Sequence, residues 1–193
     1  EAKGVRVILV SGRNLAATGS IAQFIGTCGL VVAENGGVIA RYQTPIRILA
    51  KKENAIAAFQ VLRRKMGRRI VERADSRYGI RLSDVSLEPE EARRILQESG
   101  AQVRLVDTGV TFQLLDRHVD KGLALTRLGR LEGFSMARLV AVGDNYNDLD
   151  LFREAGYNIA VANAPKEVKA LADYACKRRY GRGFLEGVAH LGL

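Results

Sequence analysis

Two aspartates in the second half of the chain lie in a segment whose residue types could bind a divalent cation. The segment Gly143-Asp144-Asn145-Tyr146-Asn147-Asp148 follows the apolar run Leu139–Val142 and precedes an expected helix. Two carboxylates at a strand end and in the first turn of the next helix can converge on one hard cation. Alternatively, Asp148 caps its helix while Asp144 and Asn145 form a turn. The spacing alone leaves both interpretations open.

Other polar residues follow strand ends where a phosphate group could be bound. Ser11 and Gly12 come after the first apolar run, and Lys121 opens a helix that follows Asp116. Each is weak evidence by itself, since a Ser-Gly pair is common in turns and most lysines are solvated. Ligands of open parallel sheets bind at the carboxyl ends of the strands. A hydroxyl, an ammonium and two carboxylates at that edge are the groups that phosphoryl transfer requires.

The elements that must position these residues fall into two styles. Short apolar strands alternating with helices are typical of a doubly wound, mostly parallel α/β sheet, and the chain shows this style at 1–41 and 118–193. Residues 42–117 instead predict an inserted α+β module. The expected strands of the flanks are Val5–Val10, Leu30–Ala33, Val38–Ala40, Leu139–Val142 and Asn158–Val161, and the expected helices begin near Leu15, Gly122, Leu149, Pro165 and Phe184. Glu34–Gly37 is expected to form a hairpin turn between two of these strands.

Within residues 42–117 a polar link from Tyr42 is expected to lead into helix 53–66. The strand 80–87, the helix 88–99 and the strands 103–107 and 111–115 follow, the last two joined by Thr108 and Gly109.

The composition narrows the class of protein. Hydrophobic residues make up 47% of the chain, which can therefore build a core, and no apolar run reaches membrane-spanning length. With no signal peptide visible, the sequence predicts a cytoplasmic protein. The net charge of +9 includes two basic runs, at 63–69 and 177–182, but aromatic residues make up only 6% of the chain and Trp is absent, which favours solvated faces over nucleic-acid binding. Cys28 and Cys176 are expected to be small buried hydrophobes, and His118 and His190 structural or surface residues.

Four segments together give a specific resemblance. In chain order they are Val10–Arg13, Glu34–Gly37, Asp120–Gly122 and Gly143–Asp148, with the insert between the second and the third. This arrangement resembles the haloacid dehalogenase superfamily, in particular the archaeal phosphoglycolate phosphatases, which carry an α/β cap after the hairpin. The resemblance implies that Ser11 and Gly12 bind the phosphoryl group, that Lys121 stabilises an aspartyl-phosphate, and that Asp144 and Asp148 hold Mg²⁺. Asn147 would support that site and contact the substrate.

The sequence departs from the family pattern at one point. The family begins with a strand ending in Asp-x-Asp-Gly-Thr, whose first Asp attacks phosphorus, and the 193 residues contain no such segment. The only Asp-x-Asp, Asp148-Leu149-Asp150, runs into a helix. Two explanations stay open: a truncated reading of an active phosphatase, which the retained metal and lysine residues favour, or an inactive relative that keeps the fold.

The resemblance implies an Mg²⁺-dependent hydrolase of a small phosphomonoester, with 2-phosphoglycolate as the expected substrate. A sugar phosphatase, including one acting on sucrose phosphate, is the first alternative. An inactive phosphate- or nucleic-acid-binding relative is the second, because the surface is basic. The sequence does not define an oligomeric state, although an unpaired apolar face of the cap would suit a homodimer.

Overall fold

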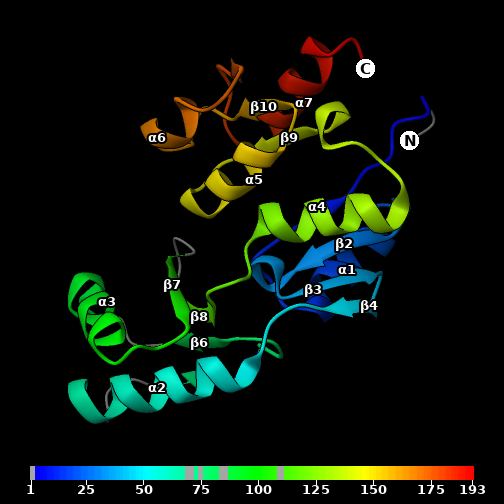
Figure 1. Cartoon of the computed structure of the whole chain (residues 1–193). Coiled ribbons are helices and arrows are strands. Elements are labelled where there is room, and N and C mark those ends of the chain that lie inside the picture. Colours follow the sequence, from blue (N-terminus) through cyan, green and yellow to red (C-terminus); the bar gives the residue numbers. More distant parts are fainter. Residues whose placement is uncertain (1–2, 68–71, 74–75, 83–86, 108–110) are drawn as a thin grey trace. The chain divides into compact units, whose positions relative to one another are not determined.

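The computed structural model describes residues 3–67, 72–73, 76–82, 87–107 and 111–193. The chain forms two compact units, Arg6–Asp120 and Lys121–Leu193, the latter joined by the residues up to Val5 (Figure 1). These are called the N-terminal and the C-terminal unit below. The expected division into a core of 1–41 and 118–193 with an insert of 42–117 stays a prediction. None of the described helices has the length and apolar character needed to cross a membrane.

The first sheet of the N-terminal unit carries the candidate phosphate loop. It contains β1 (Leu9–Val10), β2 (Leu30–Ala33), β3 (Val38–Arg41) and β4 (Thr44–Ile48) in that order, with β1 and β2 parallel and the rest antiparallel. Helix α1 (Leu15–Phe24) makes the crossover from β1 to β2, and the side chain of Asn14 caps it by accepting a hydrogen bond from the Ala17 N–H at 2.8 Å. The expected hairpin between β2 and β3 is confirmed. Ser11 therefore stands at the carboxyl end of β1.

Two expectations for this sheet are wrong. The strand expected at Val5–Val10, buried on both faces, is only the half-buried pair Leu9–Val10, and Val5 is exposed. Within the described residues β1 is an edge strand paired with β2 alone, so its apolar residues are covered less than those of a central strand. The polar link expected after Tyr42 contains strand β4. Its residues are exposed and include Pro45, which suits an edge strand and weakens the sequence signal.

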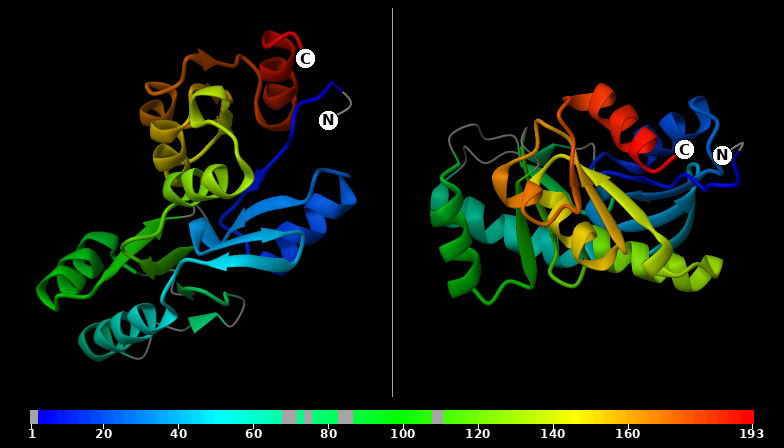
Figure 2. Two further views of the ribbon diagram at one scale, coloured as in Figure 1. Left: turned by 45° about the vertical axis from the view of Figure 1, so that its right-hand side comes forward. Right: turned by 90° about the horizontal axis from the view of Figure 1, so that it is seen from above.

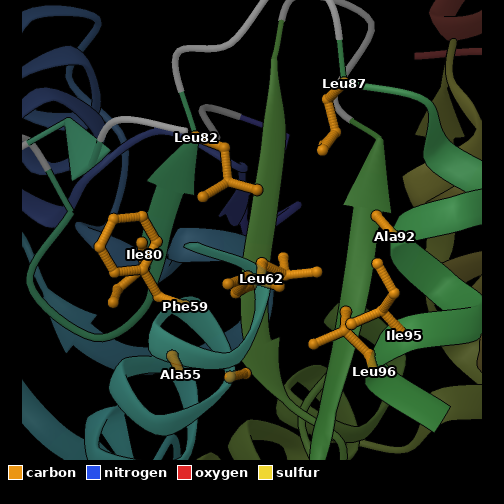
Figure 3. Packing of buried hydrophobic residues seen from close by; sticks show 11 residues of the cluster. Ala55, Phe59, Leu62, Ile80, Leu82, Leu87, Ala92, Ile95 and Leu96 are labelled. Atoms are coloured by element: carbon orange, nitrogen blue, oxygen red, sulfur yellow. The ribbon is translucent and has the colours of Figure 1, made fainter. Parts of the chain in front are cut away.

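The second sheet of the N-terminal unit is wholly antiparallel, in the order β5-β6-β8-β7. Its strands are β5 (Glu72–Arg73), β6 (Ile80–Leu82), β7 (Val103–Asp107) and β8 (Phe112–Asp116), and its helices are α2 (Lys52–Met66) and α3 (Pro89–Glu98). Figure 3 shows the hydrophobic cluster between helices and strands, which includes Phe59, Leu62, Ile80, Leu82 and Leu96. The expected α+β character is confirmed. Residues 83–86 of the expected strand and the expected turn at Thr108–Gly109 lie outside the described residues.

The C-terminal unit contains a parallel sheet in the order β11-β10-β9. Its elements are α4 (Lys121–Glu132), the turn Met136–Arg138, β9 (Val140–Gly143), the turn Tyr146–Asp148, α5 (Leu149–Glu154), β10 (Tyr157–Ala160), α6 (Lys166–Lys169), β11 (Tyr174–Ala175) and α7 (Tyr180–His190). Helices α4 and α5 lie side by side (Figure 2). The parallel α/β character expected for this part is confirmed.

Three boundaries in the C-terminal unit differ from expectation. Strand β11 is too short for a periodicity signal, and α6 is a single turn where a helix from Pro165 to Ala172 was expected. Helix α7 begins at Tyr180, before the expected Phe184. The early start follows from a bond that the sequence does not show, since the Tyr180 N–H donates to the Asn163 Oδ1 at 2.8 Å.

The cysteines and histidines conform in part to expectation. Cys176 is buried, its thiol lies 3.2 Å from the Gly183 carbonyl oxygen, and burial raises its pKa. Cys28 is only half-buried. His190 is a surface residue that stacks on Tyr174, with ring centroids 3.8 Å apart.

Glu186 in α7 ties the loop after β11 to the helix. The backbone N–H groups of Lys177 and Arg178 donate to its carboxylate at 2.9 Å, and with the Tyr174 hydroxyl they outweigh desolvation and hold its pKa below the ordinary value. A depressed carboxylate pKa contributes stability that is present above the unfolded-state pKa, about 4.3, and lost as pH falls through the folded-state pKa. We therefore expect the stability difference between wild type and Glu186→Gln to shrink as pH falls below about 4.3.

Urea unfolding at several pH values measures this difference. Glu98→Gln, which neutralises an exposed carboxylate on α3, controls for the loss of one charge. A wild-type advantage over Glu186→Gln that stays constant down to low pH would contradict the assignment.

Candidate active site

A buried ion pair links the two candidate segments of the C-terminal unit. The Nζ of Lys121, at the first position of α4, lies 2.6 Å from the Oδ1 of Asp148, and both side chains are less than 10% exposed. The second carboxylate oxygen, Oδ2, accepts the backbone N–H groups of Asp144 at 3.0 Å and of Asn145 at 3.1 Å. Both oxygens of the Asp148 carboxylate thus have hydrogen-bond donors, which a charged group needs when it is shielded from water.

Two glycines allow the segments to approach so closely. A Cβ on Gly122 would stand 2.2 Å from the backbone oxygen of Asp150, so no side chain fits between the starts of α4 and α5. A Cβ on Gly143 would lie 2.9 Å from the Cβ of Asp148. The small residues beside Lys121 and before Asp144 therefore bring the ammonium and the two carboxylates to one sheet edge.

Asp144 differs from Asp148 in its exposure. It follows β9 directly and is exposed, and its Oδ2 accepts the Asn163 side-chain amide at 3.3 Å. The Oδ1 of Asn163 accepts the N–H of Tyr180, which fixes the amide orientation and aims its Nδ2 at Asp144. Sequence reasoning missed Asn163. The rule that singled out Asp144, inspection of residues after each parallel strand, would have found it, because Asn163 follows β10 closely.

The turn Tyr146–Asp148 shows that the two interpretations of this segment are compatible. The side chain of Asn145 caps the turn and that of Asp148 accepts the Asn145 N–H, which together form a capping box. The same Asp148 carboxylate binds Lys121. Asn147 is half-buried in this turn, and its expected support of a metal site stays a prediction.

The donor set suits a hard cation held mainly from one side. Mg²⁺ is commonly bound through one or two carboxylates, with water and substrate phosphate as the remaining ligands. Asp144 offers an exposed carboxylate of this kind, whereas both oxygens of Asp148 have donors already. Within the described ranges no three His, Cys, Asp or Glu side chains form a metal-binding group. Asp144 is thus the carboxylate of this segment that best fits a cation such as Mg²⁺, and the expected binding of Mg²⁺ by Asp144 and Asp148 stays a prediction.

The loop that follows β1 in the N-terminal unit carries the expected phosphate-binding residues Ser11 and Gly12. The Ser11 N–H donates to the Val32 carbonyl oxygen at 2.8 Å, and the Ser11 carbonyl oxygen accepts the N–H of Asn35 at 3.0 Å. The hydroxyl oxygen of Ser11 accepts the Arg13 N–H at 3.1 Å. A Cβ on Gly12 would stand 2.9 Å from the Asn35 side-chain amide, so the loop presents backbone at this position. A serine hydroxyl beside backbone N–H groups suits phosphate oxygens.

The structure thus brings Lys121, Asp144 and Asp148 together in one unit and places Ser11 and Gly12 in the other. The convergence of both sets on one ligand stays a prediction.

Comparison with known proteins supports the resemblance carried by these residues. Residues 85–187 match the family of haloacid dehalogenase-like hydrolases. A phosphoglycolate phosphatase of Methanoculleus marisnigri is 36% identical over 190 residues, which cover 96% of this chain and 81% of that protein. One from Archaeoglobus fulgidus is 36% identical over 194 residues, covering 98% of this chain and 84% of that protein.

Solved structures share the fold. A crystal structure of a Thermoplasma acidophilum protein matches with a TM-score of 0.84 at 21% identity, covering 99% of this chain and 84% of that one. A sugar phosphatase of subclass IIB of the superfamily matches with a TM-score of 0.81 at 17% identity, covering 99% of this chain and 87% of that one. The chain therefore belongs to the haloacid dehalogenase-like hydrolases, in the group that includes the archaeal phosphoglycolate phosphatases.

Proposed function

We propose that the chain is the phosphate- and cation-binding part of an Mg²⁺-dependent phosphomonoester hydrolase whose substrate is 2-phosphoglycolate. The observation that carries the proposal is the buried pair of Lys121 and Asp148 beside the exposed carboxylate of Asp144. A buried ion pair stabilises a fold less than well-packed apolar residues of similar volume would. Function therefore explains the presence of this pair better than stability does. The substrate is proposed from the names of the relatives from Methanoculleus marisnigri and Archaeoglobus fulgidus.

Each residue has a role that follows from its surroundings. Lys121, held by Asp148, would place a fixed positive charge next to the transferring phosphoryl group. Ser11 and the backbone at Gly12 would donate hydrogen bonds to its oxygens. Asp144 would bind Mg²⁺ with one oxygen while Asn163 holds the other. When bound, Mg²⁺ would neutralise phosphate charge and orient the reacting oxygens.

The nucleophilic aspartate of the family pattern is not among the 193 residues. Asp148 and Asp150 do not replace it, because Asp148 is bound by Lys121 and Asp150 lies in α5, paired with Arg153. The proposed reaction runs through an aspartyl-phosphate, so it needs an Asp-x-Asp-Gly-Thr strand in addition to this chain.

Two measurements test the proposal. The 193-residue chain should bind Mg²⁺ in a calorimetric titration but hydrolyse no phosphomonoester. A protein in which an Asp-x-Asp-Gly-Thr strand precedes the chain should hydrolyse 2-phosphoglycolate only when Mg²⁺ is present. Failure of the chain to bind Mg²⁺ with or without inorganic phosphate would sink the proposal.

Sugar phosphates are the second candidate substrates, because a subclass IIB sugar phosphatase shares the fold. A comparison of kcat/KM for 2-phosphoglycolate and for a panel of sugar phosphates, sucrose phosphate included, separates the two. A clear preference for a sugar phosphate would replace the first substrate while leaving the reaction class intact.

A further inference from the structure

A network of buried polar side chains connects the two sheets of the N-terminal unit. Asn35 Nδ2 donates to Gln113 Oε1 at 2.7 Å, Gln113 Nε2 donates to Ser76 Oγ at 3.2 Å, and Ser76 Oγ donates to Glu34 Oε2 at 2.7 Å. All four side chains are at least 95% buried. Because each group donates to the next, the network has one direction and ends on a carboxylate. The backbone N–H groups of Arg77 and Tyr78 also donate to that carboxylate.

Gln113 is unusual for its position. It is the second residue of β8, and its neighbours Phe112 and Leu114, on the alternate face, join the hydrophobic cluster under α2 and α3. Its own side chain lies on the other face and is fully buried. A buried amide is costly unless both its ends are hydrogen-bonded, and here Asn35 and Ser76 satisfy them.

The turn that carries both ends of the network, Glu34 and Asn35, has a strained backbone. Glu34 and Asn35 both have left-handed φ angles, 51° and 54°, although neither is glycine. Such conformations cost free energy and persist where the surroundings over-determine them. The network supplies that constraint, because it holds both side chains of the turn.

Backbone hydrogen bonds from the strained turn fix the loop that contains Ser11. The N–H of Asn35 donates to the Ser11 carbonyl at 3.0 Å, and that of Glu34 donates to the Arg13 carbonyl at 2.9 Å. The Asn35 side chain also occupies the space where a Cβ of Gly12 would stand. A shift of Asn35 must therefore move the loop that is proposed to hold phosphate.

We propose that Gln113 is a positioning residue for the phosphate loop, acting through Asn35 from the antiparallel sheet of the N-terminal unit. The role of the loop itself rests on the proposed function. Through this link the antiparallel sheet that carries Gln113 sets the position of Ser11. A displacement of that sheet would therefore weaken the proposed hydrogen bonds to phosphate. The coupling needs no contact between Gln113 and substrate.

Amide hydrogen exchange of the 193-residue chain, followed by NMR, tests the link without any ligand. Gln113→Met keeps the length of the side chain but removes its hydrogen bonds to Asn35 and Ser76. We expect the amides of Ser11, Glu34 and Asn35 to exchange about tenfold faster, because a broken buried hydrogen bond lowers the local opening free energy. Ser76→Ala breaks the same network at its middle and serves if the first variant does not fold.

Leu114→Val is the matched control, since it removes packing from the next position of the same strand. It should speed exchange throughout the hydrophobic cluster without singling out the three amides. Equal exchange at the three amides in Gln113→Met and wild type, or the same pattern in both variants, overturns the proposal.

Binding of inorganic phosphate in the presence of Mg²⁺ gives the second readout. Gln113→Met should weaken it about tenfold, whereas Leu114→Val should leave it unchanged. Equal phosphate affinity in Gln113→Met and wild type counts against the positioning role. If phosphate does not perturb the Ser11 amide of the wild-type chain, the proposed function fails at this loop, while the exchange comparison still decides the coupling.

Discussion

Replacing Lys121 with methionine is expected to lower the free energy of unfolding by about 3–5 kcal/mol, because it leaves a buried carboxylate without its cation. The Nζ of Lys121 is the partner of Asp148 Oδ1 at 2.6 Å, and both groups are shielded from water. Urea unfolding of the 193-residue chain measures this effect. In a protein that also carries the Asp-x-Asp-Gly-Thr strand, the same substitution should abolish phosphatase activity.

A double variant separates the two consequences. Lys121→Met with Asp148→Asn removes both charges and keeps an oxygen for the N–H groups of Asp144 and Asn145, so it should recover part of the lost stability. It should not recover activity. Lys166→Met, at an exposed position of the same unit, should change stability by less than about 0.5 kcal/mol. Near-native stability or turnover in Lys121→Met would contradict the role given to this lysine.

Asp144→Asn is expected to act on function alone. Its carboxylate is exposed, so the free energy of unfolding should change by less than about 0.5 kcal/mol. Loss of the charged ligand should remove measurable Mg²⁺ binding from the 193-residue chain. It should lower Mg²⁺-dependent turnover of the extended protein by more than about a hundredfold.

Asp150→Asn is the matched control for Asp144→Asn. Asp150 lies in α5, which follows that segment, and its carboxylate pairs with Arg153 at 2.9 Å in a partly exposed pair that contributes at most about 1 kcal/mol. The Asp150→Asn variant should bind Mg²⁺ with the same affinity as the wild-type chain. Unchanged Mg²⁺ affinity in Asp144→Asn, or equal losses in both variants, would exclude Asp144 as the ligand.

The local part of the candidate site could be predicted from the sequence, because its signals are short-range. The segment Gly143–Asp148 predicts a strand end, a turn and the start of a helix, and the structure has all three. The pairing of Lys121 with Asp148 joins residues far apart in the chain, so the strand-end rule and the family resemblance suggested a shared site, but the ion pair itself needed the structure. Asn163 was missed because a single Asx after a strand is common in turns.

The features of the fold that the sequence did not predict also depend on contacts between residues far apart in the chain. β4 and β11 are strands because a neighbour supplies their hydrogen bonds, and their own sequences carry little strand signal. A polar residue in an antiparallel strand commonly faces solvent, yet Gln113 is fully buried and hydrogen-bonded to Asn35 and Ser76. Long-range partners of polar residues leave no periodicity, so these features needed coordinates.

The distribution of sulfur gives the molecule a built-in means of following its parts separately. The chain has two cysteines, and Cys28 belongs to the N-terminal unit whereas Cys176 belongs to the C-terminal unit. A thiol-specific reagent reacts only with an exposed thiolate, so burial and a raised pKa protect Cys176 until its surroundings open. Timed labelling followed by mass spectrometry would therefore record the opening of the C-terminal unit around Cys176, with the half-buried Cys28 of the N-terminal unit as the internal reference in the same sample.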